Sequence, residues 1–455
     1  MIRSAAFSGK RYAVLGLARS GLAAAEALLA SGARVTAWDR QDVARAALDG
    51  RALLADPLEI DLAGFDGVVV SPGVPLNTHP IADRARSFGV PVIGDIELFA
   101  LARADLPPHK VVGITGTNGK STTTALVRHL LESAGLPALM GGNIGLPIMA
   151  QEPLAPNANG AGVYVLELSS YQIDLTRSLA CDAAALTNIT PDHLDRYSGF
   201  DAYAASKARL FAMQEPGQFA VFGCADTPTS HIFLSEKLRR GEGRAACADK
   251  YSLAGSQPDW PSLQGPHNLE NAAIAVALVQ EIGLTRQQAE QGLRTFRGLP
   301  HRMERLGEHD GVLFINDSKA TNPASTAPAL AAYPPAPHKR IHWICGGLPK
   351  EDGLQECEPW FGNVAAAYTI GEAGPRYAEL LRPVMHVEEC EMLCEAVQRA
   401  IAAAKPGDVV LLSPACASLD QFRDYEMRGD AFRDFVNALT GPQVEIAGPN
   451  GGASI

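Results

Sequence analysis

The sequence predicts an α/β protein in which helices alternate with the strands of parallel sheets. Residues 11–38 have the pattern of a strand, a glycine turn, a helix and a strand, and residues 111–131 have that of a buried strand, a glycine-rich loop and a helix. Such alternation is typical of parallel sheets. The length of 455 residues favours about three domains. Two polar segments that contain proline are the expected boundaries, which gives domains 1–105, 106–299 and 300–455.

The composition argues against several classes of protein. Hydrophobic residues make up 47% and charged residues 20% of the chain, as in ordinary globular proteins. The formal net charge of −11 is offset by no basic block, so we expect no nucleic-acid partner. No apolar run approaches the roughly 20 residues of a membrane span, and no basic-then-apolar leader opens the chain. The eight cysteines include no metal-type CxxC pair, which indicates reduced thiols and a cytoplasmic location.

The first domain is expected to bind a nucleotide diphosphate. A strand at 11–16 turns through residues 17–21 into an alanine-rich helix, and a second strand ends at Asp39 and Arg40. An acidic residue at this distance from a glycine turn resembles the dinucleotide fingerprint. Ala18 stands where a glycine would let the backbone approach a pyrophosphate, which favours a related nucleotide-diphosphate site and leaves NAD or FAD as the alternative.

A third strand, at 67–70, ends in Ser71, Pro72 and Gly73. This rigid turn follows the carboxyl end of a strand, where open α/β sheets hold ligands. We therefore expect the turn to border the nucleotide crevice, and a tight turn without a ligand is the competing interpretation.

The central domain begins with the strand 111–115 and the loop Gly116-Thr117-Asn118-Gly119. The glycines let backbone N–H groups converge on phosphate oxygens, and the N-terminus of the following helix adds a partial positive charge. Lys120 can reach the terminal phosphates, and the hydroxyl of Ser121 can ligate Mg²⁺. The strict phosphate-loop pattern has glycine where this chain has Ile114. The sequence predicts a nucleoside triphosphate site, with a glycine-rich turn that binds no ligand as the alternative.

Further polar residues follow the next strands of this domain. Glu167 interrupts an otherwise apolar strand, and burying an unpaired carboxylate is costly, so we expect Mg²⁺ beside it or else a salt bridge. Asn143 lies in a glycine-rich loop from which it can reach a ligand, and His193 follows the strand 183–189. Lys207 lies on a predicted helix at 200–213.

The last part of the chain carries groups suited to a nucleotide and to a carboxylate. Asn271 lies near the start of an alanine-rich helix, where it can contact adenine or ribose, or cap the helix. Asp317 follows the strand 312–315 and can accept ribose hydroxyls, while Lys319 and Thr321 can meet a carboxylate. We interpret Cys416 as a buried thiol rather than a nucleophile, because no histidine lies near it in the sequence.

Together these motifs resemble those of the Mur ligase family, ATP-dependent amide-forming enzymes of peptidoglycan precursor synthesis. The resemblance covers nearly the whole chain and rests on residues 115–122, 142–145, 167–172, 188–195 and the C-terminal motifs. It implies a Rossmann-like UDP-binding domain, a P-loop ATPase-like central domain and a Rossmann-like C-terminal domain that binds an amino acid. We expect a monomer.

The resemblance also implies roles for individual residues. Those for ATP are Gly116, Thr117, Asn118, Gly119, Lys120, Ser121, Thr122, Asn271, Arg302 and Asp317. Those for two Mg²⁺ ions are Ser121, Glu167, His193 and Lys207, the last as a carbamate formed with CO₂, and the catalytic residues are Lys120, Glu167, His193 and Lys207. Those for the UDP-linked substrate are Ala18, Arg19, Asp39, Arg40, Ser71, Gly73, Asn143 and His193.

The motif Asn-Asp-Ser-Lys-Ala-Thr-Asn at 316–322 is similar to that of the family members that add D-glutamate. The implied substrates are UDP-N-acetylmuramoyl-L-alanine and D-glutamate, joined through an acyl phosphate. The implied D-glutamate residues are Lys319, Thr321, Lys350, Ser418 and Tyr425. Tyr425 stands where the family pattern has phenylalanine.

Two other functions stay open at this point. A folylpolyglutamate-synthase-like ligase shares the phosphate loop and the carbamate lysine, but the βαβ pattern ahead of the loop argues against it. A regulatory ATPase that no longer ligates is the alternative from another class of protein.

Overall fold

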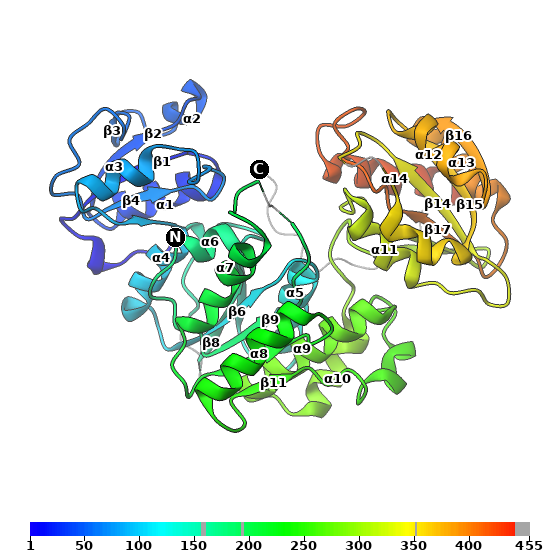
Figure 1. Ribbon diagram of the computed structural model, residues 1–455, viewed down its shortest axis with the longest axis horizontal. Coiled ribbons are helices and arrows are strands. Elements are labelled where there is room, and N and C mark those ends of the chain that lie inside the picture. Colours follow the sequence, from blue (N-terminus) through cyan, green and yellow to red (C-terminus); the bar gives the residue numbers. More distant parts are fainter. Residues whose placement is uncertain (156–160, 193–194, 351–352, 442–455) are drawn as a thin grey trace. The chain divides into compact units, whose positions relative to one another are not determined.

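The computed structural model describes residues 1–155, 161–192, 195–350 and 353–441. These residues form three sheets of almost entirely parallel strands with helices packed on them, so the predicted α/β fold class is confirmed (Figure 1). By compactness the chain divides into two units, residues 1–250 with 270–293, and residues 251–269 with 294–455. The first unit contains two of the sheets and the second unit contains the third. The boundaries predicted near residues 105 and 299 stay predictions.

The first sheet has five parallel strands in the order β3-β2-β1-β4-β5. Its strands are β1 (Arg11–Leu15), β2 (Arg34–Trp38), β3 (Leu53–Leu54), β4 (Gly67–Val70) and β5 (Val92–Ile93). Its helices are α1 (Arg19–Ala30), α2 (Asp42–Ala46), α3 (Ile81–Ser87) and α4 (Asp95–Ala102), with the 3₁₀ turns η1 (Ala5–Phe7) and η2 (Arg103–Asp105).

The turn between β1 and α1 is tighter than the sequence suggested, and α1 begins at Arg19 rather than at Leu22. A Cβ atom at Gly21 would lie 1.8 Å from the carbonyl oxygen of Gly16, so only glycine lets the helix start this close to the strand. The early start brings the first turn of α1 to the carboxyl edge of the sheet.

The second sheet has six parallel strands in the order β11-β10-β9-β6-β8-β7. Its strands are β6 (His109–Thr115), β7 (Ala138–Gly142), β8 (Gly162–Glu167), β9 (Ala183–Leu186), β10 (Phe219–Phe222) and β11 (Ala245–Cys247). The helices around it are α5 (Lys120–Ser133), α6 (Ser170–Asp174), α7 (Phe200–Ala212), α8 (Thr227–Arg240), α9 (Pro266–Ile282) and α10 (Arg286–Thr295), with the 3₁₀ turn η3 (Ile148–Ala150). The 3₁₀ turn η4 (Ala254–Asp259) belongs to the second unit.

The two sheets of the first unit share a hydrophobic core through α4. Phe99 of α4 packs edge-on against Tyr164 of β8, with ring centroids 5.0 Å apart. Glu97 of the same helix accepts hydrogen bonds from the backbone N–H groups of Arg177 and Ser178. The carboxyl edges of the two sheets are thereby held in one compact unit.

A disulfide joins Cys224, which follows β10, to Cys247 at the end of β11. The expectation that all eight cysteines are reduced thiols is therefore wrong for this pair. The remaining cysteines are free, and of these Cys394 alone is exposed. Cys416 is fully buried, as expected of a structural thiol.

The third sheet has the order β12-β13-β17-β14-β15-β16, in which only β12 and β13 pair antiparallel. Its strands are β12 (Glu304–His309), β13 (Val312–Asn316), β14 (Ile341–Gly346), β15 (Val364–Ile370), β16 (His386–Glu391) and β17 (Val409–Leu412). Its helices are α11 (Pro323–Ala331), α12 (Gly374–Leu381), α13 (Leu393–Ala403) and α14 (Tyr425–Thr440), with the 3₁₀ turn η5 (Gln355–Asn363).

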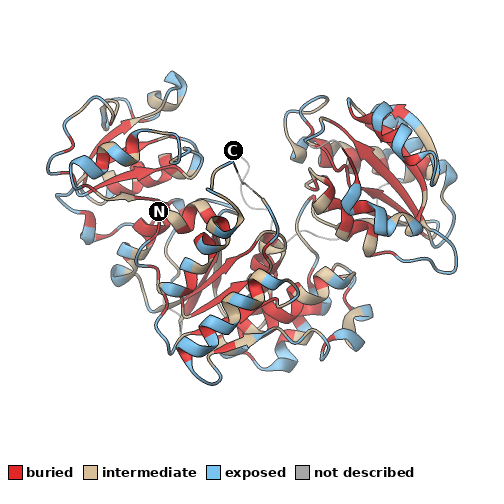
Figure 2. Cartoon of the chain, in the orientation of Figure 1, coloured by how far each residue is buried: buried red, intermediate tan, exposed pale blue. Residues whose placement is uncertain are grey.

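Burial explains why the central strands are continuous apolar runs. In β14, Trp343 packs into a core on one face of the sheet and Ile344 into a core on the other. Figure 2 shows the same pattern in all three sheets, with buried strands and helices exposed on their outward faces. Among the described residues no helix is both long and apolar enough to cross a membrane.

Candidate active site

The site lies at the carboxyl edge of the second sheet. Strand β6 pairs with β8, where Ile114 lies opposite Glu167, and with β9, where Thr115 lies opposite Leu186. The strands are parallel, so the segments that follow β6, β8 and β9 leave the sheet at the same edge. This register brings the phosphate loop, Glu167 and residues 187–192 together.

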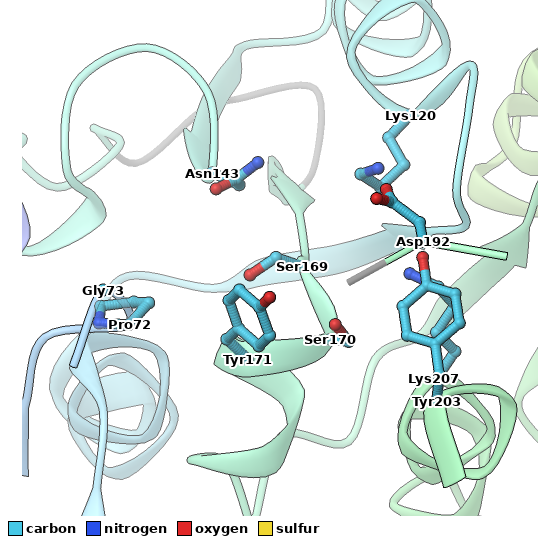
Figure 3. A pocket seen from close by; sticks show the side chains of 10 residues that line it. All are labelled: Pro72, Gly73, Lys120, Asn143, Ser169, Ser170, Tyr171, Asp192, Tyr203 and Lys207. Carbon is cyan, nitrogen blue, oxygen red and sulfur yellow. The ribbon is translucent and has the colours of Figure 1, made fainter. Parts of the chain in front are cut away.

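A cavity of about 390 Å³ opens at this edge (Figure 3). Four of the predicted site residues line it: Gly73, Lys120, Asn143 and Lys207. Six further residues line it that were not singled out as site residues: Pro72, Ser169, Ser170, Tyr171, Asp192 and Tyr203. The cavity therefore unites the turn after β4 with residues from the second sheet, as Figure 3 shows.

Residue Asn188, which follows β9, braces the phosphate loop. Its backbone carbonyl accepts a hydrogen bond from the N–H of Thr117 (2.8 Å), and its side-chain oxygen accepts one from the N–H of Asn118 (2.9 Å). The amide group of Asn188 also donates to the carbonyl oxygen of Asn118 (3.1 Å). These contacts fix the shape of the loop, which lowers the ordering cost of binding a ligand.

Two glycines of the loop are required by geometry. Gly116 and Gly119 have φ angles of 146° and 83°, which disfavour any side chain. A Cβ atom at Gly119 would lie 2.4 Å from Oδ1 of Asn271, and one at Gly116 would lie 1.9 Å from Oγ1 of Thr187. The two glycines therefore pack closely against Thr187 and Asn271, and they present only backbone groups to a bound phosphate.

The helix α5 begins at Lys120, directly after this loop. Within the described residues no side chain caps its N-terminus, so its first-turn N–H groups are suited to an anion. The Nζ atom of Lys120 donates to the carbonyl oxygens of Gly116 (3.0 Å) and Thr117 (2.7 Å), folding the side chain back over the loop. Ser121 is buried at the start of the helix, and Thr122 is half-buried beside it.

Glu167 is a buried carboxylate at the end of β8, 2% exposed. Its Oε1 atom accepts a hydrogen bond from the side-chain amide of Asn143 (3.0 Å). Its Oε2 atom is buried and has no hydrogen-bond partner among the described residues. An unsatisfied carboxylate oxygen beside a phosphate loop fits a bound cation, which agrees with the predicted metal site.

Lys207 on α7 is 2% exposed, and its Nζ atom donates to the carbonyl oxygen of Gly116 at 2.7 Å. Burial lowers the pKa of this amine well below its usual value, and the nearby charge of Lys120 lowers it further. The carboxylates of Asp192, Asp174 and Glu167 oppose that shift. The amine also lies over the ring of Tyr203, 4.5 Å from its centroid.

The sequence around the other residues that line the cavity gave only weak indications that they belong to a site. Ser169 caps α6 in a capping box with Gln172, a pattern that the spacing Ser-x-x-Gln could have shown. Tyr203 precedes Lys207 by one helical turn, and its hydroxyl lies 3.1 Å from Oγ1 of Thr117. Tyr171 follows Ser170 in α6, and nothing in its sequence neighbourhood marks it.

The predicted residues of the first domain gather at the carboxyl edge of the first sheet. The carboxylate of Asp39 accepts hydrogen bonds from the N–H groups of Leu17 (2.7 Å) and Gln41 (2.9 Å). The hydroxyl of Ser71 donates to the carbonyl oxygen of Gly16 (2.9 Å). These contacts close the glycine turn and join it to the turn after β4.

Three other predicted residues surround that turn. Ala18 is the residue before α1, and Arg40 is exposed beside Asp39. The guanidinium of Arg19 donates to the carbonyl oxygen of Gly145 (2.7 Å), which links α1 to the loop that carries Asn143.

In the second unit, Asp317 follows β13 and is 6% exposed. Its carboxylate accepts hydrogen bonds from the hydroxyl of Ser413 (2.8 Å) and the N–H of Met303 (3.1 Å). Burial raises the pKa of Asp317 to about 7, although these two donors and Arg302 oppose the rise. The Nε atom of Arg302 is buried and has no hydrogen-bond partner within the described residues.

The residues predicted for D-glutamate follow the neighbouring strands β13, β14 and β17. The Nζ atom of Lys350 donates to the hydroxyl of Thr321 (3.0 Å), and the amine of Lys319 lies 4.9 Å from the ring centroid of Tyr425. Ser418 is buried in the segment after β17. The second unit thus holds two ammonium groups and two hydroxyl groups at one sheet edge.

Arg428 of α14 connects the segments that carry these residues. It is 1% exposed, and it donates to the hydroxyl (3.0 Å) and the carbonyl oxygen (2.8 Å) of Ser318. It also donates to the carbonyl oxygens of Cys416 (3.0 Å) and Ala417 (3.1 Å). Sequence analysis missed this residue because its partners lie up to 110 positions away.

The predicted site residues therefore form two sets, one in each unit. Asn271 belongs to the first unit, and its Oδ1 atom accepts a hydrogen bond from the hydroxyl of Thr123 (3.3 Å). Arg302, Asp317 and the residues predicted for D-glutamate belong to the second unit. His193 lies outside the described residues.

Two family descriptions match most of the last three quarters of the chain. The Mur ligase middle domain matches residues 114–243, and the Mur ligase glutamate ligase domain matches residues 301–416. The first match contains the phosphate loop, Glu167 and Lys207, and the second contains Asp317, Thr321 and Lys350.

Named relatives match the chain over nearly its full length. The UDP-N-acetylmuramoylalanine–D-glutamate ligase of Novosphingobium aromaticivorans is 66% identical over 96% of this chain and 97% of its own. The enzyme of the same name from Zymomonas mobilis is 52% identical over 96% of this chain and 100% of its own.

Solved structures share the fold at much lower identity. The UDP-N-acetylmuramate-alanine ligase of Thermotoga maritima superposes with a TM-score of 0.55 at 17% identity, covering 94% of this chain and 99% of that one. A MurF structure from Acinetobacter baumannii superposes with a TM-score of 0.56 at 17% identity, covering 94% and 91%.

Proposed function

The chain belongs to the Mur ligase family, and from this membership we propose that it joins D-glutamate to UDP-N-acetylmuramoyl-L-alanine while converting ATP to ADP and phosphate. The observation that carries the proposal is the nearly full-length similarity to relatives that bear the name of this ligase. A folylpolyglutamate-synthase-like ligase and a regulatory ATPase are set aside on the same ground.

The chemistry of the second unit supports D-glutamate as the amine substrate. Lys319 and Lys350 are cations and Thr321 and Ser418 are hydroxyl donors, gathered after three neighbouring strands. A dicarboxylic amino acid carries two anionic groups that such donors can bind through charge-assisted hydrogen bonds. Alanine has no second carboxylate that could use the second ammonium group.

The chemistry of the first unit supports activation of a carboxylate by ATP. The backbone N–H groups of the phosphate loop and the ammonium of Lys120 bind the phosphates, and their charge stabilises the phosphoryl group as it moves. The terminal phosphoryl group passes to the carboxylate of the alanine moiety and gives an acyl phosphate. The amine of D-glutamate then attacks the acyl carbon, phosphate leaves, and an amide forms.

We place Mg²⁺ at Ser121 and Glu167, since the buried Oε2 atom of Glu167 has no hydrogen-bond partner in the described part of the chain. The bound ion would offset negative charge on the phosphates. Asn143 donates to Oε1 of Glu167, and this hydrogen bond would hold the carboxylate in place for such an ion. A second Mg²⁺ at His193 and Lys207 belongs to the same proposal.

The proposal includes a carbamate on Lys207. Burial lowers the pKa of the Lys207 amine, which favours its neutral form, and a neutral amine can add to CO₂, losing one proton to form a carbamate anion. The modification would put an anion beside the metal in place of an amine. Burial and the hydrogen bond to Gly116 support this assignment.

We assign the UDP-linked substrate to residues 1–105, ATP to residues 106–299 and D-glutamate to residues 300–455. A cytoplasmic location agrees with the use of ATP as a substrate, although the Cys224–Cys247 disulfide argues against a reducing compartment. A monomer is proposed because all the site residues named here belong to one chain.

A phosphate-release assay tests the proposed function. The purified protein is given ATP and UDP-N-acetylmuramoyl-L-alanine with D-glutamate, L-glutamate, L-alanine or diaminopimelate in turn. We expect phosphate release that depends on the nucleotide substrate and on D-glutamate. Equal release with L-alanine or diaminopimelate, or release without any amine, would contradict the assignment.

A further inference from the structure

The turn after β4, residues 71–75, is attached to the second sheet by one arginine. The Nη2 atom of Arg196 donates to the carbonyl oxygen of Val74 (3.0 Å) and makes a longer contact with that of Pro72 (3.5 Å). One residue earlier, the carbonyl oxygen of Asp195 accepts a hydrogen bond from the side-chain amide of Asn77 (3.0 Å). The segment 195–196 therefore holds the turn itself through Arg196 and the residues just after the turn through Asp195.

The same guanidinium also contacts the wall of the cavity. Its carbon atom lies 4.2 Å from the ring centroid of Tyr171, in a cation–π contact. The Tyr171 ring stacks on Tyr197, with centroids 6.1 Å apart, and the hydroxyl of Tyr197 donates to Asp174 (2.9 Å). Arg196 is thus supported by a chain of packed rings that ends on α6.

Arg196 contacts the turn on one side and Tyr171 on the other, and both of these border the cavity. Pro72, Gly73 and Tyr171 line it, and in Figure 3 the Tyr171 ring stands between Pro72 and Tyr203. A Cβ atom at Gly73 would meet nothing within 4 Å among the described residues, so internal packing does not require a glycine there. Bare backbone at a cavity wall suits close approach by a ligand.

We propose that Arg196, held by Tyr171, is a positioning residue for the nucleotide-sugar substrate. It acts through the carbonyl groups of Pro72 and Val74, whose orientation fixes the peptide groups of Gly73 against the ligand. This inference rests on the proposed function, because it assigns the cavity to a sugar or phosphate group of that substrate. Since the turn comes from the first sheet and Tyr171 from the second, Arg196 also couples the two sheet edges within the first unit.

The test compares Arg196→Met, Arg196→Lys and Tyr171→Leu with the wild type. Arg196→Met keeps an unbranched side chain but loses the guanidinium donor, and we expect the KM for the nucleotide-sugar substrate to rise about tenfold while the KM for ATP and for D-glutamate stays within twofold. Arg196→Lys keeps one cationic donor and is expected to recover part of the loss. Tyr171→Leu removes the ring face that the guanidinium contacts and is expected to raise the KM for the same substrate.

Arg84→Met is the matched control, because Arg84 of the same unit donates to the carbonyl oxygens of Pro57 (3.0 Å) and Ile60 (2.6 Å) and its guanidinium carbon lies 5.4 Å from the ring centroid of Phe88, and these contacts involve neither the turn nor Tyr171. Both methionine variants are expected to lower the melting temperature, but only Arg196→Met is expected to change the KM for the nucleotide sugar. If the two variants alter KM equally, or if Arg196→Met raises the KM for ATP as much, Arg196 is merely structural and the proposal fails.

Calorimetry with UDP-N-acetylmuramoyl-L-alanine in the absence of ATP separates this proposal from the proposed function. Binding to the wild type with about tenfold weaker binding to Arg196→Met supports Arg196 as a positioning residue. Equal binding to both proteins overturns that role and leaves the proposed function standing. Absence of binding to the wild type overturns the proposed function, and the inference with it.

Discussion

At the scale of single residues, the predicted site residues of each unit include buried ionisable groups. Glu167 and Lys207 are each 2% exposed, and Asp317 is 6% exposed. Burial of a charge is unfavourable unless a partner or a ligand compensates it. Glu167 keeps one unsatisfied oxygen in the described structure, and the amine of Lys207 has a strongly lowered pKa. Such groups are functional candidates on physical grounds.

The first prediction concerns Lys207. Lys207→Ala should lose most of the ligase activity, and added formate or acetate should restore part of it, because a free carboxylate can occupy the space of the lost carbamate. A ¹³C resonance of a carbamate should appear when the wild type is equilibrated with labelled CO₂ and should be missing from Lys207→Ala. Full activity of the variant, or a wild type without that resonance, would remove the carbamate from the site.

The second prediction concerns the amine substrate. Lys350→Ala and Thr321→Ala should raise the KM for D-glutamate by roughly tenfold or more and leave the KM for ATP within twofold, because each removes a donor to a carboxylate. Lys339→Ala serves as a control, since Lys339 is an exposed lysine of the same unit whose Nζ atom contacts the carbonyl oxygen of Phe361. An effect on the ATP constant alone would contradict the assignment of Lys350 and Thr321.

The third prediction concerns pH. Burial raises the pKa of Asp317 from 3.8 to about 7 in the folded protein. Between these values the unfolded chain loses the proton while the folded chain keeps it, so stability falls as pH rises, by roughly 1.4 kcal/mol for each pH unit from this group. Asp317→Asn removes this dependence of stability on pH. The difference in melting temperature, variant minus wild type, should therefore grow between pH 4 and pH 7.

A difference that stays constant over this range would show that Asp317 ionises in the folded protein as it does in the unfolded chain. Asp310→Asn, which alters an exposed carboxylate of the same unit, is a suitable control for the scan.

At the scale of elements, the chemistry lies in the segments that follow the carboxyl ends of parallel strands. The loop after β6, the turn after β4 and the segments after β13, β14 and β17 carry most of the predicted residues. Within each sheet the parallel strands end at one edge, so the segments that follow neighbouring strands of that sheet lie close together even though they are far apart in the sequence. Local hydrogen bonds, such as those of Asn188 to the phosphate loop, then fix their shape.

The fourth prediction tests that fixed loop shape. Gly119→Ala places a Cβ atom 2.4 Å from Oδ1 of Asn271 at a φ of 83°, whereas Gly135→Ala introduces one at a φ of 82° with no atom of the described residues within 4 Å. Both should lose about 1 kcal/mol of stability from the backbone conformation. Only Gly119→Ala should lose further stability and weaken ADP binding in calorimetry. Equal effects of the two substitutions would show that the contact with Asn271 does not constrain the loop.

At the scale of the whole molecule, the two compact units divide the predicted ligands between them. The first unit holds the phosphate loop and the first-sheet edge, and the second holds the residues predicted for D-glutamate. A ligase that protects an acyl phosphate from water must bring these groups together, so the three substrates should bind interdependently.

The fifth prediction concerns nucleotide choice in the full chain. With a non-hydrolysable ATP analogue present at saturation, calorimetry should show binding of UDP but not of NAD. In a dinucleotide site the acidic residue after the second strand accepts the ribose hydroxyls, but the carboxylate of Asp39 already accepts hydrogen bonds from the N–H groups of Leu17 and Gln41. Binding of NAD without binding of UDP would show that the first sheet has been misassigned.

The sequence by itself determined the fold class, the phosphate loop and the family resemblance. These features are local, because a buried strand, a glycine loop and a helix start are encoded within a few neighbouring residues. The motif at 316–322 is equally local, and its resemblance to D-glutamate-adding enzymes agrees with the names of the relatives. The predicted site residues retain their assigned roles as proposals.

Only the tertiary structure decided which residues act together. Tyr171, Asp192 and Tyr203 join the cavity, Asn188 braces the phosphate loop, and Arg196 holds a turn that is 122 positions away in the sequence. It also decided that Cys224 and Cys247 form a disulfide, against the expectation of reduced thiols. Contacts between distant segments depend on strand order and register, and a short sequence pattern encodes neither.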